Sequence, residues 1–180
     1  MALRITNVVA TAQLNCQLDL RDLDEKWILA EYHPERFSGL LLRTLYPFNG
    51  HCQLYRNGKV TVNGATSEKD AISLLDYFVR EVKKVGYDCH ADNFTIVNIV
   101  ASFDLMRSLS LPVAVTAVKR HFPKTSWEPE IFPGFSTKMN GCTAVVFRSG
   151  KVNLLGAKNF EIIQEAHTIL STILQTESIK

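Results

Sequence analysis

The chain has 180 residues, 46% of them hydrophobic and 21% charged, and this composition excludes a disordered chain. The length suits one or two compact domains. The formal net charge is +2, and the basic and acidic side chains number 11 and 11 in residues 1–90 and 9 and 7 in residues 91–180. Because the charges are so evenly balanced, the net charge of the protein cannot attract nucleic acid. Any surface that binds nucleic acid must come from the local placement of basic residues.

The first half of the chain begins with a β-branched run, Ile5–Thr11, that predicts a strand. A less regular, partly helical stretch is expected at Leu18–Leu29. Three strands are expected after it, near residues 37–45, 51–56 and 59–63. The last two are joined by Asn57-Gly58, a dipeptide that is typical of hairpin turns.

A helix is expected to close this half, with Ser67 as its N-cap and Gly86 as its stop. Its apolar residues recur at helical spacing and predict one buried face, formed by Ile72, Leu75, Phe78, Val79, Val82 and Val85. In the preceding strand, Val60 and Val62 alternate with polar residues. One side of that strand should therefore face the core, and the other should not.

The second half follows the same order. A strand is expected at Thr95–Ser102, a partly helical stretch at Pro112–Phe122, and a hairpin turn at Ser149-Gly150. A closing helix follows Asn159. Its expected apolar face is formed by Phe160, Ile163, Ala166, Ile169, Leu170 and Ile173.

Four short segments of the first half recur in the second, in the same order and at offsets of 91 to 95 residues. The pairs are Asn7–Thr11 with Asn98–Ser102, Pro34–Gly39 with Pro129–Gly134, Tyr55–Val60 with Phe147–Val152, and Gly64–Thr66 with Gly156–Lys158. We therefore expect two diverged copies of one α/β unit, at residues 1–90 and 91–180. Each copy should pack an antiparallel sheet against helices on one side and leave the other side open for binding.

The cysteines predict reduced thiols in a reducing compartment, because Cys16, Cys52, Cys89 and Cys142 form no CxxC pair. The nearby histidines repeat no ligand spacing, so neither a zinc site nor any other metal or cofactor is expected. The first residues lack an apolar signal core, and no stretch approaches 18 apolar residues. We expect a soluble, intracellular protein that does not contact a membrane.

Several of these segments resemble the core of the TATA-binding protein family, namely Asn7–Thr11, Ala30–Phe37, Ser126–Gly134 and Val145–Lys151. The likeness extends in order over roughly residues 3–175. It implies an α+β saddle, in which a pseudo-twofold repeat of two units forms one curved antiparallel sheet with helices on the convex face. It also implies that the concave face grips the minor groove of double-stranded DNA.

In that family each half offers two phenylalanines that wedge between base steps. The matching residues are Phe37 with Tyr55 and Phe132 with Phe147. Flat apolar rings suit this role, because unstacking a base step costs a few kcal/mol that stacking must offset. Tyr55 departs from the family pattern, and its hydroxyl should weaken the kink in that half.

The resemblance also assigns groove-edge, sheet-floor and rim residues. Asn7 and Asn98 match the pair that reaches the groove edge, where A·T pairs show only acceptors. The floor positions are Val9, Thr61, Asn63, Val100, Val145, Asn153 and Leu155, with Gln53 where an aliphatic residue is expected. The basic rim comprises Arg36, Arg43, Arg56, Lys59, Lys138, Arg148, Lys151 and Lys158. The polar floor should weaken A·T preference, because buried amides are left unpaired.

The segment containing Glu128, Glu130 and Ile131 matches the second stirrup of the family, where a TFIIB-like factor docks. A first stirrup, which the family uses to contact a TFIIA-like factor, is expected at Leu45–His51 and is one residue longer than usual. The resemblance implies a nuclear general transcription initiation factor that binds and bends promoter DNA, with polymerase-specific associated factors as further partners.

An alternative is an adaptor that keeps the protein-binding stirrups but has lost selective TATA binding. The even charge of the first half and the residues Tyr55, Gln53, Asn63 and Asn153 favour it. An enzyme is not expected, because His33, His121 and His167 lie in unrelated contexts and no acid–base or nucleophile cluster repeats.

Overall fold

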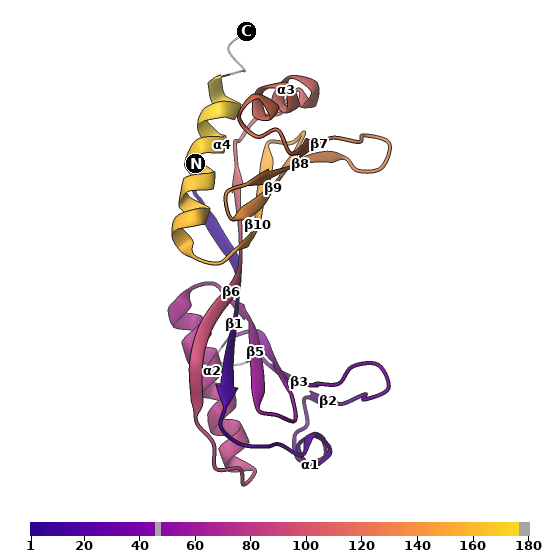
Figure 1. Ribbon diagram of the computed structural model, residues 1–180, viewed down its shortest axis with the longest axis vertical. Coiled ribbons are helices and arrows are strands. Elements are labelled where there is room, and N and C mark those ends of the chain that lie inside the picture. The colour runs from indigo at the N-terminus through magenta and orange to yellow at the C-terminus, as the bar shows by residue number, and fades with distance from the viewer. Residues whose placement is uncertain (46–47, 177–180) are drawn as a thin grey trace. The chain divides into compact units, whose positions relative to one another are not determined.

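In the computed structural model, which describes residues 1–45 and 48–176, the chain divides into two compact units (Figure 1). We call Asn7–Val97 the N-terminal unit, and Asn98–Lys180 together with Met1–Thr6 the C-terminal unit. The long strands β1 (Arg4–Leu14) and β6 (Ala91–Asp104) each contribute residues to both units.

The two units contain the same kinds of element in the same order. The N-terminal unit continues with α1 (Leu20–Lys26), β2 (Ala30–Glu31), β3 (Leu40–Thr44), β4 (Gly50–Leu54), β5 (Lys59–Ala65) and α2 (Glu68–Lys84). The C-terminal unit continues after β6 with α3 (Leu111–His121), β7 (Thr125–Ser126), β8 (Gly134–Met139), β9 (Cys142–Phe147), β10 (Lys151–Ala157) and α4 (Phe160–Thr176). The described strands form one antiparallel sheet in the order β2-β3-β4-β5-β1-β6-β10-β9-β8-β7. The expected α+β class and the repeat are confirmed.

In the N-terminal unit, α2 packs on one face of β4 and β5 (Figure 1). Val60 and Val62 are buried on that face, as the alternation of their strand predicts. The hairpin turn at Asn57-Gly58 is also confirmed, because the N–H of Gly58 donates to the carbonyl of Tyr55 at 2.9 Å.

The ends of α2 are as predicted, but its buried face is rotated. The Ser67 hydroxyl accepts from the N–H of Asp70 at 3.0 Å, and Gly86 follows the C-cap. The buried residues are Ala71, Leu74, Leu75, Phe78 and Val82. Ile72 was wrongly placed in the core and is exposed, because the stripe that meets the sheet runs through its neighbour Ala71.

In the C-terminal unit, α4 packs on β9 and β10, and α3 packs on α4 and β8. Asn159 accepts from the N–H of Ile162 at 3.0 Å and so caps α4. Ile163, Ala166 and Leu170 are buried as predicted. Ile169 was wrongly expected in the core and is exposed, because Ser171 and Leu174 take the inward positions of the last turns.

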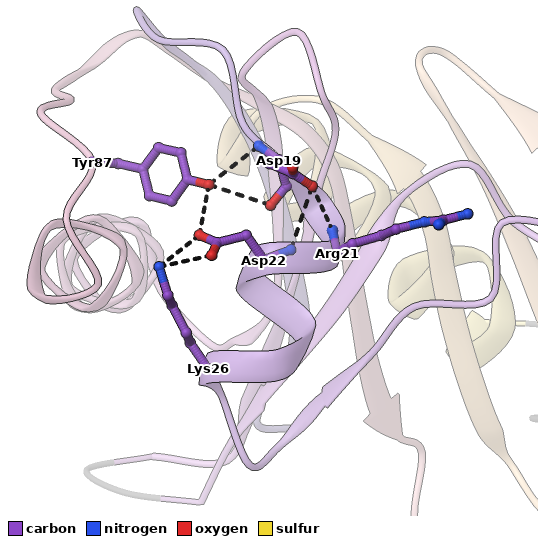
Figure 2. Close-up of polar contacts among 5 residues, drawn as sticks. All are labelled: Asp19, Arg21, Asp22, Lys26 and Tyr87. Carbon is purple, nitrogen blue, oxygen red and sulfur yellow. Dashed lines mark hydrogen bonds and ion pairs between the residues drawn. The ribbon is translucent and has the colours of Figure 1, made fainter.

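Helix α1 is shorter than the predicted helical stretch and is tied to the loop after α2 (Figure 2). Asp19 caps it by accepting from the N–H of Arg21 at 3.0 Å. The Tyr87 hydroxyl donates to Asp22 Oδ2 at 3.0 Å, and Lys26 lies 2.8 Å from the same carboxylate. The bonds from Lys26 and then Tyr87 lower the pKa of the Asp22 carboxyl. These contacts attach α1 to the rest of its unit.

Two of the cysteines lie together in the N-terminal unit. The N–H of Asn15 donates to the carbonyl of His90 at 3.2 Å, and the neighbouring thiols of Cys16 and Cys89 lie close enough to affect each other's pKa. Both thiols are free, and burial raises the pKa of Cys89 to about 11. Within the residues that the structure covers, no group of three His, Cys, Asp or Glu side chains could hold a metal ion, and no helix is long and apolar enough to cross a membrane.

Candidate nucleic-acid interface

The face of the sheet opposite α2 in the N-terminal unit, which we call the N-terminal open face, carries the strand residues expected to contact DNA. The alternate residues of the same strands, such as Val8 and Ala10, are buried against the helix. By this alternation the open face includes Asn7, Val9, Arg43, Tyr55, Lys59, Thr61 and Asn63. The strands thus bring these residues onto one surface.

The C-terminal unit repeats this arrangement on the face opposite α4, which we call the C-terminal open face. Ile99, Val146, Val152 and Leu154 are fully buried on the helix side. Their neighbours on the open face are Asn98, Val100, Lys138, Val145, Phe147, Lys151, Asn153 and Leu155. Lys158 follows β10 and is exposed.

Phe37 and Tyr55 form an aromatic pair at one end of the N-terminal open face. Their ring centroids lie 5.7 Å apart with planes at 68°, and Phe37 is 40% exposed. Both rings lie over Gly39, where an added Cβ would come within 2.7 Å of Phe37 Cε1 and 3.1 Å of Tyr55 Cε1. The glycine therefore makes room for the pair, and part of the Phe37 ring stays available for stacking.

Phe132 and Phe147 repeat this pair on the C-terminal open face. Their centroids are also 5.7 Å apart, with planes at 55°, and Phe132 is 42% exposed. They lie over Gly134, where a Cβ would be 3.1 Å from the first ring and 3.2 Å from the second. Each unit thus has an aromatic pair in which one phenylalanine, Phe37 or Phe132, is exposed, as a wedge requires.

Asn7 is held by a bulge in β5. The ladder between β1 and β5 shifts register between the pairs Val8–Ala65 and Ala10–Val62. Gly64 in this bulge has φ of 104°, a conformation that disfavours any side chain. Its N–H donates to Asn7 Oδ1 at 2.9 Å. The acceptor of the Asn7 amide is thus occupied, and its NH₂ group remains as a donor.

Asn98 occupies the matching position of the C-terminal unit without that bond. The corresponding ladder also has a bulge, between the pairs Leu154–Ala101 and Ala157–Ile99. Asn98 Oδ1 is nevertheless buried and has no hydrogen-bond partner in the described residues. The two asparagines share a position but differ in their surroundings.

The middle of each open face consists of two cross-strand rows. In the N-terminal unit the pairing gives Leu41–Gln53–Thr61–Thr11 and Arg43–His51–Asn63. In the C-terminal unit it gives Ser136–Val145–Asn153–Ser102 and Lys138–Thr143–Leu155. The N-terminal rows are the more polar, because Gln53 and Asn63 stand where the other unit has Val145 and Leu155.

The basic residues expected at the rim are exposed, but two of them have acidic neighbours. Arg43 Nε lies 3.2 Å from Glu31 Oε1. Lys151 is paired in register with Asp104. The remaining exposed cations of the expected rim are Arg36, Arg56, Lys59, Lys138, Arg148 and Lys158. Positive charge on the open faces is therefore modest, in line with the net charge of the chain.

The predicted partner residues lie in the loop between β7 and β8. The N–H groups of Ile131 and Phe132 both donate to the carbonyl of Glu128 at 3.0 Å, and Ile131 is 79% exposed. Glu130 is exposed within the same turn. This turn leads directly into the aromatic pair.

The matching turn of the N-terminal unit is at His33–Phe37, where the N–H groups of Arg36 and Phe37 donate to the carbonyl of His33 at 2.9 Å. The predicted first stirrup, Leu45–His51, instead follows β3 and includes the first two residues of β4, and Tyr46 and Pro47 in it lie outside the described residues. In the repeat, Leu45–His51 corresponds to the segment that joins β8 and β9, not to the loop between β7 and β8.

Sequence reasoning missed His51 as an open-face residue. It lies between Arg43 and Asn63 in the second row. Burial, and then the nearby Arg43 charge, lower its pKa below the ordinary histidine value of 6.5. The alternation with buried Cys52 is the signal that could have found it.

Comparison with known proteins agrees with this geometry. The family described as "Transcription factor TFIID (or TATA-binding protein, TBP)" matches residues 2–85 and 93–176. The chain is 35% identical to TATA-box-binding protein 2 of Entamoeba histolytica over 94% of this chain and 79% of that one. It is 33% identical to TATA-box-binding protein-like 1 of the same organism, covering 94% and 78%.

Among solved structures, Methanococcus jannaschii TBP superposes with a TM-score of 0.82 at 28% identity, covering 98% of this chain and 99% of that one. The family match covers both repeats, and the structural match covers nearly the whole chain. The chain belongs to the TATA-binding protein family and is a non-enzymatic transcription factor of that family.

Proposed function

We propose that this protein binds the minor groove of promoter DNA with its open faces, bends the duplex and recruits general initiation factors. The observation that carries this proposal is the aromatic pair seated over a glycine, found once in each unit with the same 5.7 Å spacing. Exposed rings that are packed over a glycine at the start of a strand can insert between base steps, and stacking then offsets an unstacking cost of a few kcal/mol per step.

The asparagine of the N-terminal unit supports the same function. Because the N–H of Gly64 occupies Asn7 Oδ1, the Asn7 NH₂ group is the part of the amide left to bind a ligand. A·T pairs present only acceptors in the minor groove, namely adenine N3 and thymine O2. A donor that cannot turn into an acceptor suits that edge.

The loop that contains Glu128, Glu130 and Ile131 is the proposed docking site for a TFIIB-like factor. Its two carboxylates and one exposed apolar side chain form a compact epitope beside Phe132. A TFIIA-like factor and polymerase-specific factors are further proposed partners, and the proposed location is the nucleus. Glu128→Arg should lower the affinity of a TFIIB-like factor for the protein–DNA complex, whereas Glu165→Arg on the exposed side of α4 should not. Equal loss in both variants would exclude this docking site.

The test of selective DNA binding is the affinity for a TATA duplex and a G·C-rich duplex of equal length, measured across a salt series. We expect the TATA duplex to bind more than about threefold tighter at every salt concentration, since each mismatched pair typically costs about 1–3 kcal/mol. The salt slope reports the phosphate contacts, at about 0.9 per contact. Affinities that agree within about threefold would remove selective readout.

A second candidate function, an adaptor without selective TATA binding, is favoured by the polar N-terminal open face. Gln53 and Asn63 introduce amides, and Glu31 partly neutralises Arg43. In this case the TFIIB-like factor would bind the chain with or without TATA DNA. The same duplex comparison therefore decides between the two functions.

A further inference from the structure

The N-terminal open face differs from the C-terminal one in what it can accept from a base pair. In the minor groove a G·C pair differs from an A·T pair by the guanine N2 amino group, which is a donor. An apolar side chain against that amino group leaves its N–H unpaired, whereas an amide oxygen can accept from it. The chemistry of the central rows therefore determines which base pairs each face tolerates.

Two amides in the N-terminal rows are available for such a bond. Gln53 lies between Leu41 and Thr61, and Asn63 lies between His51 and the bulge at Gly64. Within the described part of the chain, neither amide hydrogen-bonds to another group. This contrasts with Asn7, whose oxygen is held by Gly64.

His51 adds a third acceptor to these rows. Its ring is half-buried and beside Arg43, and both conditions favour the neutral form. A neutral imidazole keeps one acceptor nitrogen. Acceptors thus occur at three neighbouring positions of the N-terminal open face.

The matching positions of the C-terminal open face are Val145 for Gln53, Thr143 for His51 and Leu155 for Asn63. Leu155 is 36% exposed and presents an aliphatic side chain. Asn153 is the one amide in these rows and lies between Val145 and Ser102. This face is therefore the one that complements the A·T edge, which has no projecting amino group.

We infer that the N-terminal open face accepts a G·C pair in the minor groove through the amide oxygens of Gln53 and Asn63, while the C-terminal open face requires A·T. This inference rests on the proposed binding of the minor groove. It gives the recognised site a polarity, because the two faces demand different base pairs.

A palindromic duplex of A·T pairs provides the test, because its two halves are identical and either can lie on either unit. A G·C pair is placed at each position of one half in turn, and then at the symmetric positions of both halves. At one position or more, the single substitution should change the affinity less than about twofold. The symmetric double substitution should lower it roughly 5- to 150-fold, the effect of one mismatched pair.

Inosine isolates the amino group, because an inosine·C pair lacks the guanine N2 amine. Replacing guanine by inosine in the double-substituted duplex should restore the affinity to within about twofold of the A·T duplex. If inosine does not restore the affinity, the inference is overturned, because the guanine N2 amine is then not the group that the protein distinguishes.

The variant Gln53→Val with Asn63→Leu gives the N-terminal open face the residues of the other unit. In this variant the single G·C substitution should cost roughly 5-fold or more, while the A·T duplex is still bound. Gln164→Val, on the exposed side of α4, is the control and should leave every ratio unchanged. If the double variant fails to fold, the inosine series on the wild-type protein decides alone.

Two further outcomes would overturn the inference while leaving DNA binding intact. One is a single G·C pair that costs fivefold or more at every position, and the other is a symmetric double substitution that costs no more than the single one. Failure to bind even the unsubstituted A·T duplex would overturn both the inference and the proposed function.

Discussion

Asn7 Oδ1 accepts a hydrogen bond of 2.9 Å from the backbone N–H of Gly64. This bond joins two strands, because Asn7 is in β1 and Gly64 is in the bulge of β5. It holds the amide with its oxygen toward the protein and leaves the NH₂ group as the donor. Asn98 has no such bond in the described residues, so only the N-terminal asparagine is oriented by the backbone.

Asn7→Asp separates folding from DNA binding. A carboxylate can still accept from Gly64, so the free energy of unfolding should stay within about 0.5 kcal/mol of wild type. The new charge faces base acceptors and phosphates, so the affinity for a TATA duplex should fall at least about tenfold. Urea unfolding and equilibrium binding measure the two effects. Asn140→Asp in the β8–β9 turn carries the same charge change, and an equal loss of affinity there would contradict the role of Asn7.

Gly134→Ala should destabilise the protein more than Gly39→Ala. At Gly134 the new Cβ would lie 2.6 Å from the backbone oxygen of Val146, so the hairpin must shift, at a cost of about 1–3 kcal/mol. At Gly39 the nearest atom, at 2.7 Å, is in the Phe37 ring, which can move. Urea unfolding measures both variants against Ser38→Ala as control. Equal losses of stability for the two glycines would show that the backbone contact is unimportant.

Tyr87→Phe tests the attachment of α1 in Figure 2. It removes the hydroxyl that bonds to Asp22 at 3.0 Å, so the free energy of unfolding should fall by about 0.5–1.5 kcal/mol. Tyr77→Phe is the matched control, because the Tyr77 ring packs edge-on against Phe78 through its carbon atoms. If both variants unfold at the same urea concentration as wild type, the Tyr87 network does not stabilise α1.

The stability of the protein should fall as the pH drops below about 6.5, in part because of His167. Burial lowers the pKa of His167. Its ring packs edge-on against Phe103, with the two ring centroids 4.7 Å apart. The unfolded chain therefore takes up a proton near pH 6.5, before the folded one does, and this favours unfolding as the pH falls. His51, with a lowered pKa, acts in the same direction.

His167→Phe keeps the ring and removes the titration. The variant and the wild type are compared at about pH 7.5 and about pH 5.0, because histidine titrates between these values. The urea midpoint of the variant should fall less over this interval than that of wild type. The remaining dependence includes that of His51. Parallel midpoint curves for the two proteins would contradict a lowered pKa of the partly buried His167.

The repeat and the open face could be read from the sequence, because both depend on local patterns. Val60 and Val62 are buried and Thr61 is not, as period-two alternation requires. The pair of Phe37 with Tyr55 was expected from the family resemblance, and the repeat aligns these two residues with Phe132 and Phe147. Each residue of the first pair therefore has an aromatic counterpart in the second copy of the repeat.

Other features depend on tertiary packing and carry no local signal. The rotation of α2 that exposes Ile72 depends on how the helix meets β4 and β5. The bond from Gly64 to Asn7 requires a bulge at a particular point of the ladder. The contact of Cys16 with Cys89 joins residues that are distant in sequence.

The central claim, that exposed ring pairs bend minor-groove DNA, is tested most directly by the bend angle of a bound TATA duplex, measured by energy transfer between dyes at its ends. Wild type should bring the ends together, and Phe132→Ala with Phe147→Ala should reduce the bend, because one wedge is lost. Phe160→Ala in α4 is the control within the same unit. A bend that is absent in wild type, or unchanged in the double variant, would contradict the account.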